Sequence, residues 1–199
     1  MLDPSTIGPD RSWFLDVNEW ARDTPWLHGV MKAYAGYGVG LFAVLLLAGY
    51  VIARRSGDAR AMAASLWAGV ATLLAVAINQ PVASGVDEPR PFTALPHLLV
   101  LAHRSTDPSF ASDHATMAGA VAVGLLLVAW RLGVVAVVAA LLMAFARVYV
   151  GAHYPVDVIA GLALGGGVTA LGWLSLRPTL TWAIERIAAS RLRFAVPVR

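Results

Sequence analysis

His153 and Asp157 have the spacing of a nucleophile and the group that orients it. The two residues are four positions apart, so a helix that begins at Tyr154 or Pro155 would turn the carboxylate back toward the imidazole. A carboxylate that accepts a hydrogen bond from one ring nitrogen leaves the other free to attack an electrophile or take a proton. The pair therefore indicates His153 as a nucleophile. The alternative is that Asp157 only caps the helix, beside an interfacial histidine without a role.

A second element, Ser112-Asp113-His114, precedes an apolar run and has the pattern of a helix start. Ser112 is expected to be the N-cap residue, with His114 just inside the helix. The free amide hydrogens and the positive end of the helix dipole favour an anion at this point. His114 is thus a candidate general acid, a role that contributes about 10²- to 10⁴-fold in rate. A capped helix entrance without chemistry is the alternative.

Arg90 and Arg147 supply the positive charge that such a site needs. Guanidinium groups match phosphate oxygens with two parallel hydrogen bonds. Two arginines, two histidines and two helix N-termini together describe a phosphoryl-transfer site that works by positioning and charge stabilisation. The alternatives are an ion pair of Arg90 with Glu88, and Arg147 snorkelling toward lipid headgroups.

Membrane helices are expected to position these groups. The chain is 58% hydrophobic and 14% charged, with a mean hydropathy of +0.67, which is too apolar for an ordinary soluble domain. About 20 helical residues cross the hydrocarbon layer. We therefore expect an all-α integral membrane protein with a bundle of five transmembrane helices, at residues 32–53, 61–82, 115–130, 132–150 and 156–176, the third starting nearer Ser112. Residues 12–29 are expected to form an amphipathic helix at the membrane interface, or alternatively one that packs on the soluble side.

Basic residues in short loops predict the orientation of the chain. Arg54, Arg55 and Arg60 share one loop, and such residues concentrate on the cytoplasmic side. The arginines after residue 176 fall on the same side if all five spans are present. We expect a plasma-membrane protein with its N-terminus outside, its C-terminus in the cytoplasm and its reactive groups facing outward. A single domain is expected over residues 1–199, with an interfacial segment at 1–30, the catalytic motifs at 79–161 and a basic cytoplasmic tail at 177–199.

The composition also excludes several kinds of site and partner. The chain has no cysteine, which excludes disulfides, thiolate metal sites, iron–sulfur centres and a cysteine nucleophile. The net charge is +3, but the basic residues separate apolar runs and form no stripe with aromatic residues. The expected partners are therefore the lipid bilayer and a lipid substrate, and no nucleic acid. The sequence leaves the oligomeric state open.

The three elements together resemble the signature of the type 2 phosphatidic acid phosphatase superfamily. Its parts appear as Arg90-Pro91, Ser112-Asp113-His114, and Arg147 followed by His153 and Asp157. Order and spacing agree with the signature, and the resemblance runs over residues 79–161. The Ile-Asn-Gln sequence at 78–80 and the aspartate at 113 are similar to the bacterial undecaprenyl pyrophosphate phosphatase subgroup.

The resemblance implies a phosphatase that needs no metal or cofactor. His153 would attack phosphorus, Asp157 would orient it, and His114 would protonate the leaving oxygen. Water would then hydrolyse the phosphohistidine. The phosphate oxygens would be held by Ser112, Arg90 and Arg147.

Two positions depart from the family pattern. Ala83 stands where the family carries a lysine, so one phosphate contact is missing or is supplied elsewhere. Ala111 replaces the proline before the serine, which should loosen the turn without removing a ligand.

Arg104 precedes the second element and is expected either to contact a second phosphate or to pair with Asp107.

The leading hypothesis is hydrolysis of a polyprenyl (undecaprenyl or decaprenyl) diphosphate to the monophosphate, which carries cell-wall precursors. One alternative keeps the chemistry but changes the lipid, to phosphatidic acid, phosphatidylglycerol phosphate or a prenyl-phosphoribose phosphate. A non-catalytic lipid transporter or scaffold is another alternative. A metal site is a further one, which would leave both arginines unexplained. Its candidate ligands are His97, His103, Asp107, His114, His153 and Asp157.

Overall fold

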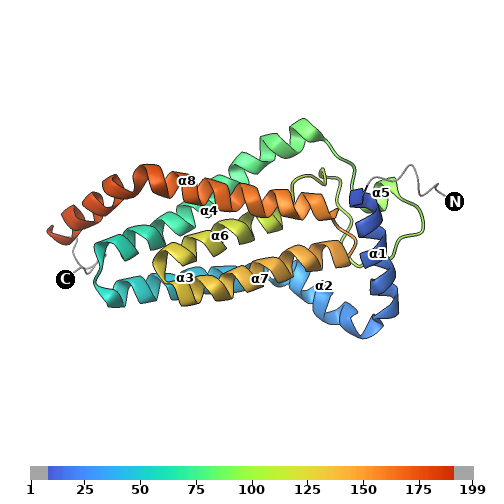
Figure 1. Ribbon diagram of the computed structural model, residues 1–199, viewed down its shortest axis with the longest axis horizontal. Helices are drawn as coiled ribbons and strands as arrows, with labels where there is room; N and C mark the ends of the chain where they lie inside the picture. The colour runs from blue at the N-terminus through green and yellow to red at the C-terminus, as the bar shows by residue number, and fades with distance from the viewer. Residues whose placement is uncertain (1–8, 191–199) are drawn as a thin grey trace.

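The computed structural model describes residues 9–190, and this part of the chain folds into helices joined by short turns and one long connection. The helices, in chain order, are α1 (Pro9–Asp23), the 3₁₀ turn η2 (Pro25–Leu27), α2 (His28–Tyr37), α3 (Val39–Ser56), α4 (Ala59–Val86), α5 (Pro91–Ala94), α6 (Asp113–Val128), α7 (Trp130–Tyr149) and α8 (Pro155–Ala188). Figure 1 shows α3, α4, α6, α7 and α8 running along one another, with α1 lying across one end of the bundle. The predicted all-helical fold is confirmed.

Helix α6 forms the centre of the bundle, where it packs against α4, α7 and α8. Small residues allow α6 and α8 to approach each other closely. A Cβ atom on Gly165 would lie 1.9 Å from the Thr116 carbonyl oxygen, and one on Gly161 would lie 2.7 Å from that of Ser112. Close backbone packing through small residues is a general feature of helices in lipid. It brings the first turns of α6 and α8 together, and both turns carry predicted site residues.

The first predicted span is wrong in its boundaries, because residues 32–53 form two helices. Helix α2 ends at Tyr37 and α3 begins at Val39, with Gly38 between them. A side chain at Gly38 would collide with the Met143 side chain and the Tyr34 carbonyl, each 2.5 Å from the added Cβ. The chain thus changes direction where only a glycine fits against α7, and α2 extends outward at an angle to α3 (Figure 1).

Four helical stretches in the described part of the chain are long and apolar enough to cross a membrane, namely α3, the stretch that begins with α4, α7 and α8. Helix α6 is apolar but has only 16 residues. It begins at Asp113, as predicted for the third span. Helix α8 continues to Ala188 with Pro178 inside it, so the predicted basic tail begins within a helix. Residues 191–199 of that tail lie outside the described residues.

Helix α1 fastens the loops at one end of the bundle. Its Asn18 side chain donates to the Leu99 carbonyl oxygen at 2.8 Å and accepts from the Leu99 amide at 3.1 Å. The Asp10 carboxylate accepts the amide hydrogen of Val156 at 2.9 Å, in the first turn of α8. The structure divides the predicted helix at 12–29 into three elements, α1, η2 and the start of α2. Trp13 and Trp20 of α1 remain partly exposed, and Trp20 also packs against Phe145 and Tyr149 of α7.

Candidate active site

Four of the seven predicted site residues meet in one cavity at the end of the bundle that α1 covers, and Ser112, Asp157 and Arg104 are not among its lining residues. The cavity has a volume of about 730 Å³, and four of the predicted residues line it: Arg90, His114, Arg147 and His153. They come from three distant stretches of the chain. The long connection between α4 and α6 closes over this end, because the Leu101 and Ala102 amides both donate to the Val150 carbonyl oxygen at 3.0 Å.

His153 lies in the turn between α7 and α8, with 3% of its surface exposed. Its Nδ1 atom lies 2.8 Å from the Ser109 carbonyl oxygen. A carbonyl oxygen can only accept, so Nδ1 carries the hydrogen and Nε2 carries the lone pair in the neutral ring. Burial, strengthened by the nearby charges of Arg147 and Arg90, lowers the pKa of His153 from 6.5 to about 4. The ring is therefore neutral near pH 7, which is the state that a nucleophile requires.

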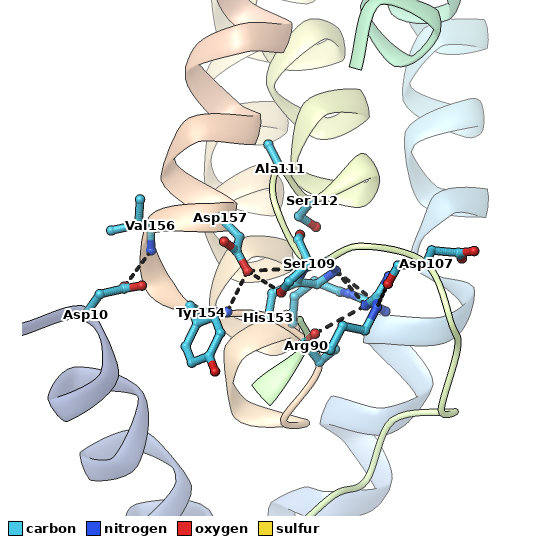
Figure 2. Close-up of polar contacts among 12 residues, drawn as sticks. Asp10, Arg90, Asp107, Ser109, Ala111, Ser112, His153, Tyr154, Val156 and Asp157 are labelled. Carbon is cyan, nitrogen blue, oxygen red and sulfur yellow. Dashed lines mark hydrogen bonds and ion pairs between the residues drawn. The ribbon is translucent and has the colours of Figure 1, made fainter. Parts of the chain in front are cut away.

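Asp157 holds the turn around His153 and does not make the direct hydrogen bond to the ring that the sequence suggested. Its Oδ2 atom is 3.6 Å from Nδ1 of His153, beyond normal hydrogen-bond length. That oxygen instead accepts from the Ser109 hydroxyl and from the Tyr154 amide, the latter at 2.8 Å (Figure 2). Asp157 thus caps the first turn of α8 and fixes Ser109, whose carbonyl orients the imidazole.

The two arginines approach the unprotonated nitrogen of His153. Nη1 of Arg90 is 3.2 Å from Nε2, and Nη2 of Arg147 is 3.3 Å from it. Backbone carbonyl oxygens hold both guanidinium groups: Arg90 donates to Asp107 at 2.9 Å and to Ala152 at 3.2 Å, and Arg147 donates to Ala35 at 3.2 Å. These acceptors are neutral, so they position the guanidinium groups and leave their positive charge available to an anion.

These contacts decide the alternatives for the two arginines. Arg90 is held by carbonyl oxygens, and the described contacts include no ion pair between it and Glu88. Arg147 points into the cavity and donates to Ala35 and His153, so it does not snorkel toward lipid headgroups. Both arginines face the place where a phosphoryl group in contact with His153 would lie.

The start of α6 forms another wall of the site. Ser112 occupies the N-cap position as predicted, but its side chain makes no capping hydrogen bond, and its buried hydroxyl has no partner among the described residues. The Asp113 carboxylate accepts from Asn79 at 2.8 Å and from Gln80 at 3.0 Å, which ties α6 to α4. His114, one residue further, is half-buried and lines the cavity.

The model of the PAP2 superfamily matches residues 64–180, which is more than half of the chain and includes all three elements of the site. This chain belongs to the PAP2 superfamily. It is a membrane lipid phosphatase, with apolar helices that suit a bilayer and a cavity lined by Arg90, His114, Arg147 and His153.

Sequence and structure relatives agree with this membership. The chain is 33% identical to the undecaprenyl-diphosphatase BcrC of Bacillus subtilis over 138 residues, which cover 69% of each protein. The crystal structure of Aquifex aeolicus LpxE has a TM-score of 0.63 at 22% identity, with 87% of this chain and 99% of that one covered. A PAP2 type phosphatidylglycerolphosphate phosphatase from Bacillus subtilis has a TM-score of 0.61 at 20% identity, with 94% and 90% covered. These two structures establish the shared fold.

Other predicted residues of this PAP2 phosphatase lie elsewhere. Arg104 is exposed, and its guanidinium carbon lies 5.8 Å from the centroid of the Phe92 ring; it does not line the cavity with the other described residues. Ala83 does line the cavity and brings no charge to it. The metal-site alternative lacks its ligands, since residues 9–190 contain no group of three or more His, Asp or Glu side chains placed to hold a metal ion.

Ser109 and Lys32 also lie at the PAP2 site, and neither was predicted from the sequence. Ser109 acts through its backbone carbonyl as well as its hydroxyl, and a carbonyl has no residue-type signal. Its position three residues before Ser112 is the one available hint. Lys32 lines the cavity from α2, a segment that carries none of the family motifs.

Proposed function

We propose that this phosphatase hydrolyses a polyprenyl diphosphate to the monophosphate and inorganic phosphate. The likeness to an undecaprenyl-diphosphatase over more than two thirds of the chain supports this choice of lipid. The observation that carries the chemistry is the position of Nε2 of His153, with a guanidinium nitrogen of Arg90 and one of Arg147 within 3.3 Å. A terminal phosphate bound by both arginines would present its phosphorus to the lone pair of that nitrogen.

In the first step, Nε2 of His153 forms a bond to the terminal phosphorus, and the bond from phosphorus to the bridging oxygen breaks. His114 gives a proton to that leaving oxygen, so the lipid departs as the monophosphate. Arg90 and Arg147 stabilise the charge on the three equatorial oxygens, and the unpartnered Ser112 hydroxyl is a further donor to them. The Ser109 carbonyl stabilises the hydrogen on Nδ1 as the ring gains positive charge.

In the second step, water replaces the histidine at phosphorus. His114, now neutral, takes a proton from the attacking water, and the bond between Nε2 and phosphorus breaks. Inorganic phosphate leaves, and both imidazoles return to their starting states. No step requires a metal ion or an organic cofactor.

The proposed orientation places the site at the outer face of the plasma membrane, with the N-terminus outside and the C-terminus in the cytoplasm. The turn between α3 and α4, with Arg54, Arg55 and Arg60, lies at the end of the bundle opposite to α1 (Figure 1). Basic residues at that end favour the cytoplasm. Helix α6 would be the fifth, short crossing. The exposed Trp13 and Trp20 on α1 suit the headgroup region.

A phosphate-release panel in detergent tests this function. The substrates are undecaprenyl diphosphate, phosphatidic acid and phosphatidylglycerol phosphate, with EDTA present throughout and the His153→Ala variant as control. We expect the highest kcat/KM on the diphosphate, undiminished by EDTA, and no turnover by the variant. A preference for phosphatidic acid above tenfold, about 1.4 kcal/mol in the barrier, would overturn the choice of lipid. A variant that retains full function would favour the lipid scaffold.

A further inference from the structure

Lys32 is the single lysine among the 15 lysine and arginine residues of the sequence, and it lines the catalytic cavity. It comes from α2, which lies far in sequence from the three motifs that define the site. Ala35 and Gly36, three and four residues further on, line the same cavity. Residues with this spacing share one face of a helix, so this face of α2 forms a wall of the cavity.

Two hydrogen bonds with α7 hold α2 in this position. Nη1 of Arg147 donates to the Ala35 carbonyl oxygen at 3.2 Å, and the Tyr34 hydroxyl donates to that of Ala139 at 2.8 Å. One of the two arginines beside the nucleophile therefore also holds the helix that carries Lys32. The position of Lys32 is therefore coupled to that of Arg147.

The Lys32 side chain is exposed, and no ion pair to a carboxylate is found for it among residues 9–190. Two carboxylates line the cavity with it, those of Asp107 and Asp113. Asp113 already accepts hydrogen bonds from Asn79 and Gln80. The ammonium group is thus a positive charge that the protein itself leaves available to an anion in the cavity.

This charge comes from a different element of the fold than the two arginines beside the nucleophile. The two arginines that contact Nε2 of His153 come from the N-cap of α5 and from the last turn of α7, whereas Lys32 comes from α2. The two arginines bracket the position of the transferred phosphoryl group. Lys32 therefore suits a second anionic group at another wall of the cavity, whose volume of about 730 Å³ falls in the usual range for ligand sites. Ala83 contributes a methyl group from α4 to the same cavity and no competing charge.

We propose that Lys32 binds the phosphate that stays on the lipid, and so makes the site selective for a lipid diphosphate over a lipid monophosphate. The inference rests on the proposed function. In it, Arg90 and Arg147 hold the terminal phosphate, and Lys32 donates from the α2 wall to the oxygens of the adjoining phosphate. A hydrogen bond between charged groups of this kind corresponds to about a ten- to hundredfold change in kcat/KM.

The selectivity is measured with a prenyl diphosphate and the prenyl monophosphate of the same chain length. Lys32→Gln should lower the diphosphate-to-monophosphate ratio of kcat/KM at least tenfold, and Lys32→Arg should restore most of it. Arg131→Gln is the matched control, because Arg131 is an exposed residue stacked on Trp130 outside the cavity. A ratio that Lys32→Gln changes by less than twofold would overturn the proposal.

The unique lysine allows a second test that needs no turnover. An amine-selective acylating reagent can react only with Lys32 and the terminal amine of the chain, and mass spectrometry separates the two products. In the His153→Ala variant, the prenyl diphosphate should slow acylation of Lys32 at least tenfold more than the monophosphate does. Equal protection by both lipids would contradict the proposal. Failure of the wild-type protein to release phosphate from the diphosphate would instead overturn the proposed function, and the acylation result would remain interpretable.

Discussion

Removing the Ser109 hydroxyl tests how the nucleophile is held in place. This hydroxyl donates to Oδ2 of Asp157, while the carbonyl of the same residue accepts from Nδ1 of His153. Ser109→Ala deletes the link between the carboxylate and the segment that orients the ring. Both partners are fully buried, and a hydrogen bond to a charged group contributes about 1.5–3 kcal/mol. If this loss is expressed in the transition state, kcat/KM falls by about ten- to hundredfold.

The assay is phosphate release from a prenyl diphosphate in detergent, with thermal unfolding measured in parallel to separate misfolding from misplacement. Ser175→Ala is the matched control, because its hydroxyl donates only to the Leu171 carbonyl oxygen on an exposed surface of α8. We expect Ser175→Ala to retain wild-type activity. If Ser109→Ala retained kcat/KM within twofold while Asp157→Asn lost it, the carboxylate would act on His153 without Ser109, and the reasoning from the structure would be refuted.

Three further results are expected. Burial lowers the pKa of His153 to about 4, so its ¹⁵N NMR signal, assigned as the one that the His153→Asn variant lacks, should titrate near pH 4. For the same reason, the free energy of unfolding should fall as the pH drops from about 6.5 through 4. Titration of this signal near pH 6.5 would contradict the burial of the ring. Arg147→Lys should lower kcat/KM by about ten- to hundredfold, because one ammonium group cannot contact both the Ala35 carbonyl oxygen and the reacting groups beside His153. Activity equal to that of the wild type would show that the two-pronged guanidinium group is not required. Gly165→Ala should destabilise the protein by about 1–3 kcal/mol in thermal unfolding, because its Cβ would lie 1.9 Å from the Thr116 carbonyl oxygen. Gly167→Ala is the control and should leave the stability unchanged, because there is open space around Gly167.

The sequence predicted most of the helices because their signal is local. Long apolar runs identify α4, α7 and α8 whatever their neighbours are, and Ser112 marks the start of α6 by residue type. The break at Gly38 was not predicted, since one of the two contacts that leave no room for a side chain there is with Met143 on α7, more than a hundred residues away in sequence. The extension of α8 past residue 176 was missed because hydropathy declines there while the helix continues.

Side-chain type and spacing predicted most of the residues of the site but not the contacts between them. His153, Asp157 and Arg147 were identified from their spacing, and their convergence with Arg90 required the fold. The sequence suggested that Asp157 contacts the imidazole directly, yet the hydrogen on Nδ1 points to a backbone carbonyl. Lys32 was not predicted as a site residue, because a single lysine at the start of an apolar run has no distinctive pattern. Only the packing of α2 against α7 brings it to the cavity.

The central claim is that His153 attacks phosphorus, and the stereochemical course of the reaction tests it most directly. The substrate is a prenyl diphosphate whose terminal phosphorus is made chiral with sulfur and oxygen isotopes, and the configuration of the released thiophosphate is determined. Each in-line displacement inverts phosphorus. Attack by His153 followed by water predicts overall retention, whereas overall inversion would show that water attacks directly and would contradict the account.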